Sequence, residues 1–145
     1  MKNKKGFTLL EIIIVIIIVG VLASLALPRF FSTVEFSRST EALASLAALR
    51  QSMERCYLQN AGSYANCDVM ANLDLENPGN SPNAHFTYMM GPTGGGVGAP
   101  VGTTYRITST RNGRDTGDGL STIYIDQDVT QAIIRAGTSK FQAIK

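Results

Sequence analysis

The sequence has little of the chemistry that enzymes and metalloproteins use. Its 145 residues include one His, two Cys and no Trp. A single His excludes a multi-histidine metal site, and two Cys without a C-x-x-C-H motif exclude both haem attachment and a zinc ribbon. The G-x-S-x-G motif of hydrolases is absent, and no Lys follows the glycine-rich residues 91–98 as a P-loop requires. We therefore expect no enzymatic activity and no cofactor.

Charge is also scarce. Charged residues make up 17% of the chain and hydrophobic residues 44%, which excludes an intrinsically disordered protein. Removal of residues 1–6 lowers the number of Lys and Arg from 13 to 10, against 11 Asp and Glu. The net charge of +2 therefore comes from the N-terminal tip, and we expect no specific nucleic-acid partner.

One long apolar run lies near the N-terminus. Residues 12–28 carry no charge, and the run extends back to Phe7. About 20 apolar residues are enough to span a membrane as a helix. Lys2, Lys4 and Lys5 precede the run, so the positive-inside rule places the N-terminus in the cytoplasm and the rest of the chain outside. A signal peptide fits less well, because its small-residue cleavage site is missing, but hydropathy alone also allows a plain membrane anchor.

The start of this run contains an unusual acid. Glu11 lies among apolar residues, where a carboxylate costs several kcal/mol unless it is paired. Residues 5–11, KGFTLLE, resemble the prepilin processing motif of type IV pilins and type II secretion pseudopilins. Gly20 and Pro28 also stand where this family has a glycine and a proline, and the resemblance covers roughly residues 5–57. It implies that a membrane prepilin peptidase cuts between Gly6 and Phe7 and N-methylates Phe7.

Physical chemistry gives these residues a role in assembly. The new amine of Phe7 is a cation that can pair with Glu11 of a neighbouring subunit, which neutralises both charges and sets the axial register. Gly20 and Pro28 weaken the helix between them, because glycine is flexible and proline lacks a backbone donor. This stretch can kink or melt when the helix leaves the bilayer. An ordinary proline kink is the alternative.

The apolar pattern continues beyond Pro28 with a different character. Apolar residues mostly three or four apart, with charges between them, predict one helix over residues 7–58 whose second half is amphipathic. We expect the apolar stripe of this half to pack on a sheet. Its members are Phe30, Phe31, Val34, Leu43, Leu46, Leu49, Met53 and Tyr57.

The remaining residues, 59–145, predict a small head with an antiparallel sheet. Alternating patterns indicate strands over residues 85–90, 104–110 and 121–126, and residues 111–119 join the last two as a hairpin. Residues 128–136 fit either a helical turn or a further strand. The expected fold class is α+β, the pilin fold, with a leader (1–6), an assembly helix (7–28), an amphipathic half-helix (29–58) and the head (59–145). Four apolar residues provide a cover for the sheet: Ile133, Ile134, Phe141 and Ile144.

Two residue pairs beyond the apolar run are candidate sites. Cys56 and Cys67 would lie outside the cytoplasm, where disulfides persist, and closing this loop stabilises by about 3 kcal/mol; two free thiols are the alternative. Asp115 and Asp118 lie in a glycine-rich turn whose oxygens could bind Ca²⁺, but the EF-hand spacing is not met. A solvated hairpin turn is the simpler interpretation, and we expect no other metal site.

The resemblance implies a structural function. The expected protein is a subunit of a type IV pilus-like helical filament, a homo-oligomer built with dedicated assembly machinery. Its single-pass precursor would reside in the inner membrane before it enters a cell-surface filament. The main alternative is the major pseudopilin of a type II secretion system in a periplasmic pseudopilus. A membrane-anchored binding protein is a distant alternative.

Overall fold

The computed structural model describes residues 6–67, 69–91, 104–115, 117–127, 133–142 and 144. The three leader lysines, the glycine-rich stretch after Gly91 and Asp128 lie outside these residues. The chain divides into two compact units, Met1–Ser37 and Arg38–Lys145, which we describe separately.

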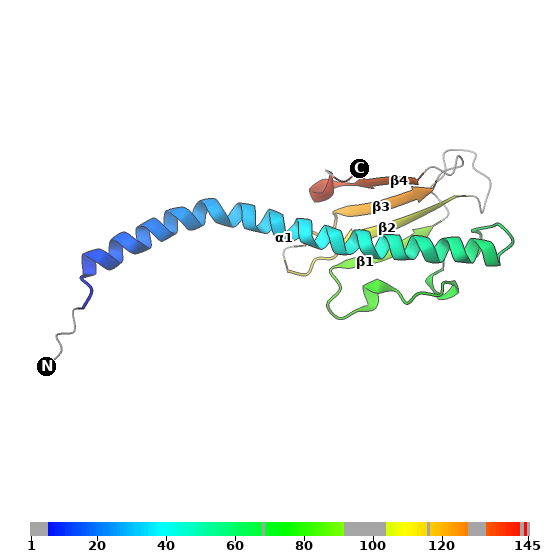
Figure 1. The fold of residues 1–145 in the computed structure, drawn as a ribbon, viewed down its shortest axis with the longest axis horizontal. Helices are drawn as coiled ribbons and strands as arrows, with labels where there is room; N and C mark the ends of the chain where they lie inside the picture. Colours follow the sequence, from blue (N-terminus) through cyan, green and yellow to red (C-terminus); the bar gives the residue numbers. More distant parts are fainter. Residues whose placement is uncertain are drawn as a thin grey trace. The chain divides into compact units, whose positions relative to one another are not determined.

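A single helix, α1 (Leu9–Gln59), contributes to both units (Figure 1). It begins and ends within two residues of the predicted bounds, and it runs through Pro28. At its C-terminal end, the Gly62 N–H donates to the Tyr57 carbonyl at 3.0 Å, while Ala61 and Gly62 both have positive φ angles. This pattern is a Schellman cap, which satisfies helix carbonyls that would otherwise have no partner.

Four antiparallel strands form the sheet of the second unit, in the order β1-β2-β3-β4 (Figure 1). They are β1 (Phe86–Gly91), β2 (Tyr105–Arg111), β3 (Thr122–Gln127) and β4 (Ile133–Gly137). The three predicted strands and the β2–β3 hairpin are confirmed, each strand within one residue of its predicted bounds. β4 shows that residues 133–136 of the undecided segment are a strand.

The core of this unit lies between one face of α1 and one face of the sheet. Residues buried on the helix recur every three or four positions, which aligns them on one face. They are Ser39, Ala42, Leu46, Leu49, Ser52, Met53 and Cys56. Alternate residues of the strands bury the opposing face: Phe86, Tyr88, Tyr105, Ile107, Ile123 and Ile125.

The predicted stripe is therefore confirmed only in part. Leu46, Leu49 and Met53 are buried, and Leu43 and Tyr57 pack against the core. Phe30 and Phe31 are instead exposed in the first unit, where their rings contact each other edge to face. The period of an amphipathic pattern gives the face of a helix, but it does not give the point along the helix where its partner begins.

A short 3-10 helix, η3 (Ser139–Phe141), follows β4 and provides part of the predicted cover. Phe141 is buried against Phe86, with ring centroids 5.8 Å apart, and Ile144 is partly buried. Gly137 is required here, because a Cβ at this position would overlap the Phe141 backbone. Two further 3-10 helices, η1 (Met70–Asn72) and η2 (Pro78–Asn80), lie in the connection between α1 and β1.

Candidate functional site

The predicted processing bond lies just before α1. Gly6, Phe7 and Thr8 are not helical, and the Phe7 side chain is 81% exposed. The Thr8 N–H donates to the Glu11 carboxylate, and the Glu11 N–H donates to the Thr8 hydroxyl oxygen, both at 3.3 Å. The Thr8 hydroxyl also donates to the same carboxylate at 3.3 Å. These reciprocal bonds are a capping box, which satisfies two backbone donors at the start of a helix.

Sequence reasoning missed Thr8, although the signal was present. Residues 8–11 read T-L-L-E, and Ser or Thr followed three residues later by Glu is the sequence signature of a capping box. Glu11 therefore has a partner within its own chain. Its predicted pairing with Phe7 of a neighbouring subunit remains a prediction.

The surface of the first half of α1 is apolar and exposed. The helix is long and apolar enough to cross a membrane, by length and composition. Its large side chains from Leu9 to Leu27 are all exposed in the isolated chain. A large apolar surface that is exposed in a single chain normally marks a site that a membrane or other protein chains cover.

Gly20 and Pro28 both lie inside the continuous helix. A Cβ at Gly20 would contact nothing within 4 Å, so neighbouring side chains do not require a glycine here. Near Pro28, the Ser32 and Thr33 hydroxyls donate to the Arg29 carbonyl at 2.9 and 3.0 Å. The structure shows residues 20–28 as helix. That this stretch melts on leaving the bilayer stays a prediction.

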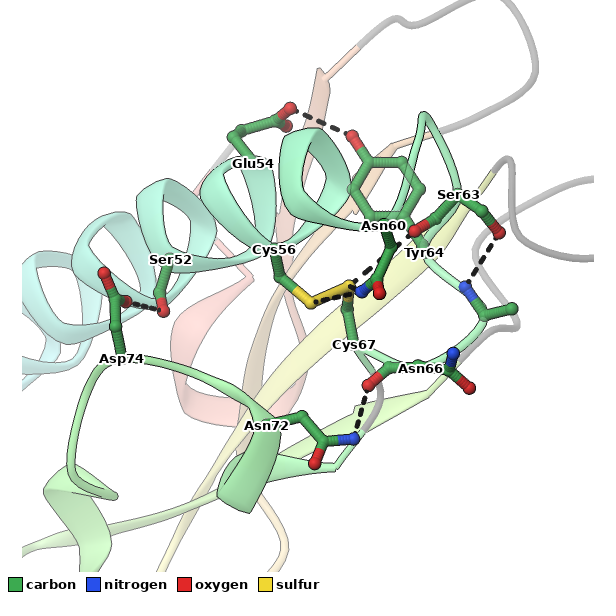
Figure 2. The surroundings of a disulfide bond; sticks show 11 residues. Ser52, Glu54, Cys56, Asn60, Ser63, Tyr64, Asn66, Cys67, Asn72 and Asp74 are labelled. Carbon is green, nitrogen blue, oxygen red and sulfur yellow. Dashed lines mark hydrogen bonds between the residues drawn. A yellow bond between two sulfur atoms is a disulfide. The ribbon is translucent and has the colours of Figure 1, made fainter.

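The predicted disulfide joins the end of α1 to the loop that follows (Figure 2). The Cys56 and Cys67 sulfurs are bonded, with Cα atoms 5.9 Å apart, and both residues are buried. The Asn60 amide donates to both sulfurs, at 3.2 and 3.3 Å. The bond closes a loop at the point where the chain leaves the helix.

A tyrosine cluster reinforces this same corner. The Glu54 carboxylate accepts hydrogen bonds from the Tyr64 hydroxyl at 2.9 Å and the Tyr105 hydroxyl at 3.1 Å. The Tyr64 ring lies against the rings of Tyr57 and Tyr105, with centroids 4.5 and 4.8 Å away. Burial, followed by the contacts with Glu54, raises the pKa of both Tyr64 and Tyr105. The cluster links α1, the loop and β2.

Asp74 connects the α1–β1 loop to the helix. Its carboxylate accepts from Arg55 Nε at 2.5 Å and Nη2 at 2.8 Å, and from the Ser52 hydroxyl (Figure 2 shows the Ser52 bond). The hydrogen bonds from Arg55 and then Ser52 lower the pKa of Asp74 to about 2. A second bidentate pair joins Arg106 and Asp126 on adjacent strands, at 2.7 and 2.5 Å.

The two candidate calcium ligands have separate roles. Asp118 accepts from the backbone N–H groups of Leu120 and Ser121 and from the Ser121 hydroxyl, and the Ser121 side chain is the largest cause of its lowered pKa. Asp115 lies 3.3 Å from Arg38 Nη2 and 3.4 Å from His85 Nε2. Within the described residues, no group of three His, Cys, Asp or Glu could hold a metal ion. Because of its hydrogen bonds to Leu120 and Ser121, Asp118 caps the β2–β3 turn.

His85 lies between α1 and the same turn. Its Nδ1 lies 3.3 Å from the Glu41 carboxylate on α1, and its Nε2 faces Asp115. The backbone carbonyl of His85 accepts from the buried Arg111 at 3.0 Å. The single His is thus part of the structure that holds the turn.

A processing motif, an exposed apolar helix and a four-stranded sheet together define a pilin-like protein. Residues 1–27 match the prokaryotic N-terminal methylation motif. Residues 28–120 match the family described as type IV minor pilin ComP, DNA uptake sequence receptor, and the chain belongs to this family.

Relatives come from both pili and secretion systems. Fimbrial protein Q of Moraxella bovis is 29% identical over 119 residues, which covers 79% of this chain and 75% of that protein. A probable minor fimbrial protein of Dichelobacter nodosus is 41% identical over 75 residues, covering 49% of this chain and 47% of the relative. Type II secretion system core protein G of Klebsiella pneumoniae is 39% identical over 61 residues, covering 42% and 44%. The matched region thus spans less than half of the last two relatives.

These matches confirm the predicted type IV pilin or pseudopilin family and the pilin-like α+β fold. Proteins of this family are structural subunits rather than enzymes. Family membership supports processing by a prepilin peptidase and assembly with pilus or secretion machinery. The methylation motif and the apolar helix indicate an inner-membrane precursor that later enters a pilus or pseudopilus.

Proposed function

We propose that this chain is a structural subunit of a type IV pilus-like helical filament. The observation that carries the proposal is the exposed apolar surface of α1 from Leu9 to Leu27, with the single acid Glu11 near its start. In the bilayer, lipid covers this surface. In a filament, the same surface packs against neighbouring helices, so the subunit exchanges lipid contacts for protein contacts.

Each candidate residue has a part in this process. Cleavage between Gly6 and Phe7 removes leader 1–6 and creates the amine that is then methylated. The amine pairs with Glu11 of a neighbour, because an unpaired carboxylate in apolar surroundings is costly. The stretch from Gly20 to Pro28 adapts as helix 7–28 leaves the membrane. Residues 29–58 and the head at 59–145 remain outside the cytoplasm.

Mass spectrometry and electron microscopy test the proposal directly. We expect the mature protein to begin at Phe7 and carry one added methyl group, and the cells to produce filaments that contain it. A first residue at Met1, or at any position after Pro28, would contradict the proposed processing. Correct processing without any filament would contradict the proposed assembly.

A periplasmic pseudopilus is the main alternative. The core protein G of Klebsiella pneumoniae supports it, because this secretion protein matches 42% of the chain. Deletion of the gene separates the two functions. Loss of a secreted enzyme with surface pili intact would favour the pseudopilus, whereas loss of surface filaments with normal secretion favours the pilus. A membrane-anchored binding protein would leave both unchanged.

DNA reception is a second candidate function, because the description of the matched family names a DNA uptake sequence receptor. The sequence predicted no specific nucleic-acid partner. From residue 38 onward, nine Lys and Arg balance nine Asp and Glu, and Arg38, Arg55 and Arg106 each pair with an acid. Binding through phosphate contacts alone should therefore be weak. A gel-shift titration of a soluble chain that begins at Arg29, with specific and scrambled duplexes at physiological salt, distinguishes a receptor from a purely structural subunit.

A further inference from the structure

We propose that Thr8 and Glu11 position the bond between Gly6 and Phe7 for cleavage by fixing the residue at which α1 begins. This inference rests on the proposed function, because it concerns the processing step. It gives Thr8 the role of a positioning residue, and it gives Glu11 a role that is separate from pairing between subunits.

The contacts of the capping box define the helix start. Thr8 occupies the N-cap and Glu11 the third helical position, and their side chains each accept the other's backbone N–H at 3.3 Å. The first helical backbone bond runs from the Ile12 N–H to the Thr8 carbonyl, also at 3.3 Å. A residue at the N-cap has non-helical backbone angles, so the helix cannot continue toward Phe7 while the box is intact.

The cleaved bond thus lies outside the helix. Gly6 and Phe7 are non-helical, and a Cβ at Gly6 would meet no atom within 4 Å. Among the described residues, none crowds the backbone at this point, so the bond is accessible to a peptidase. If the helix continued through Gly6, the Gly6 carbonyl would accept a bond from the Leu10 N–H. That carbonyl is the group to which water adds when the peptide bond breaks into a Gly6 carboxylate and a Phe7 amine.

Side-chain chemistry allows the two roles of Glu11 to be separated. A capping box accepts Gln as well as Glu at the third position, because either side chain can accept the backbone N–H. Glu11→Gln therefore keeps the box but removes the negative charge that pairing with a neighbour needs. Thr8→Val removes the hydroxyl, keeps the shape of the side chain and keeps the charge of Glu11. Thr8→Ser keeps the hydroxyl and is the matched control.

The experiment measures cleavage of the full precursor by prepilin peptidase in membranes. We expect Thr8→Val to be cleaved about two- to thirtyfold more slowly, the range that loss of an N-cap implies. Thr8→Ser and Glu11→Gln should be cleaved at close to the wild-type rate, and Glu11→Gln should still fail to form filaments. In detergent micelles, backbone chemical shifts should move Phe7 and Thr8 toward helical values only in Thr8→Val. Equal amounts of precursor in the membrane show that insertion is unchanged.

Three results would overturn the proposal. The first is wild-type cleavage of Thr8→Val. The second is equal slowing of Thr8→Val and Thr8→Ser, which would show recognition of the threonine's shape by the peptidase. The third is slow cleavage of Glu11→Gln, which would show recognition of the charge. A wild-type precursor that is not cut after Gly6 at all is a different result, because it contradicts the proposed function itself.

Discussion

At the scale of single residues, charged groups of the second unit join neighbouring segments through ion pairs and hydrogen bonds. Asp74 holds the α1–β1 loop to Arg55 and Ser52, and Arg106 and Asp126 join two strands. Asp115 brings Arg38 and His85 to the β2–β3 turn. Several of these charges lie in different segments of the sequence, and nothing in the sequence pattern indicates which acid meets which base.

Asp74 gives the head a specific dependence on pH. Its pKa in the folded protein, about 2, is below its ordinary value of 3.8. The stability that it contributes is therefore present above about pH 4 and is lost as the pH falls toward 2. We expect Asp74→Asn to lower the melting temperature of the head by a few degrees at pH 7 and to make no difference near pH 2. Thermal unfolding followed by circular dichroism measures both.

The neighbouring exposed acid provides the control for this prediction. Glu76→Gln removes the same charge a short distance along the loop and should leave the melting temperature unchanged. If Glu76→Gln lowers the melting temperature as much as Asp74→Asn, the effect comes from the net charge of the loop and not from the contacts of Asp74.

At the scale of elements, the corner where α1 ends depends on one covalent bond and one hydrogen-bonded cluster. The disulfide between Cys56 and Cys67 and the bond from Tyr64 to Glu54 hold the loop to the helix, and the bond from Tyr105 to Glu54 joins β2 to the same corner. We expect replacement of both cysteines by Ser to cost about 3 kcal/mol of unfolding free energy, because the unfolded chain regains the freedom of the loop. Urea unfolding of a soluble chain that begins at Arg29 measures this cost.

Intact-mass measurement checks the bond itself. Alkylation of the unreduced native protein should add nothing to its mass, and alkylation after reduction should label two thiols. Labelling of both thiols without reduction would contradict the disulfide.

The sequence predicted the positions of the secondary-structure elements better than it predicted the contacts of single residues. Alternation placed β1, β2 and β3 within one residue, because buried residues alternate with less buried ones along most of each strand. The pattern left residues 128–136 undecided, since a short apolar pair such as Ile133 and Ile134 satisfies a strand or a helical turn equally. Glu11 was recognised from its cost in apolar surroundings, whereas Thr8 was missed because a threonine there has no such cost.

At the scale of the whole molecule, the second unit should fold without the membrane segment. A chain that begins at Arg29 keeps the helical face that carries Leu46, Leu49 and Met53, and we expect it to be soluble, monomeric and folded. A chain that begins at Gln59 exposes the buried face of the sheet and should be unstable. Circular dichroism and size-exclusion chromatography compare the two, and equal stability would contradict the packing of α1 on the sheet.

A point variant separates packing from chain length. Leu46 is fully buried, and Leu46→Ala in the chain that begins at Arg29 should cost about 2–5 kcal/mol. Leu58 is 77% exposed on the same helix, so Leu58→Ala is the matched control and should have little effect on unfolding. Equal costs for the two variants would show that the core does not lie where the structure places it.

The order of the strands has a consequence for the sequence of events in folding. Each strand pairs with the strand that follows it in the chain, so the sheet contains only contacts between successive segments and can form quickly once β4 has been synthesised. The helix is made first, yet Leu46 and Leu49 meet their partners only after β1, β2 and β3 exist. Docking of the helix on the sheet is therefore a late step. In the proposed precursor, the apolar half of α1 holds the chain at the membrane throughout that interval.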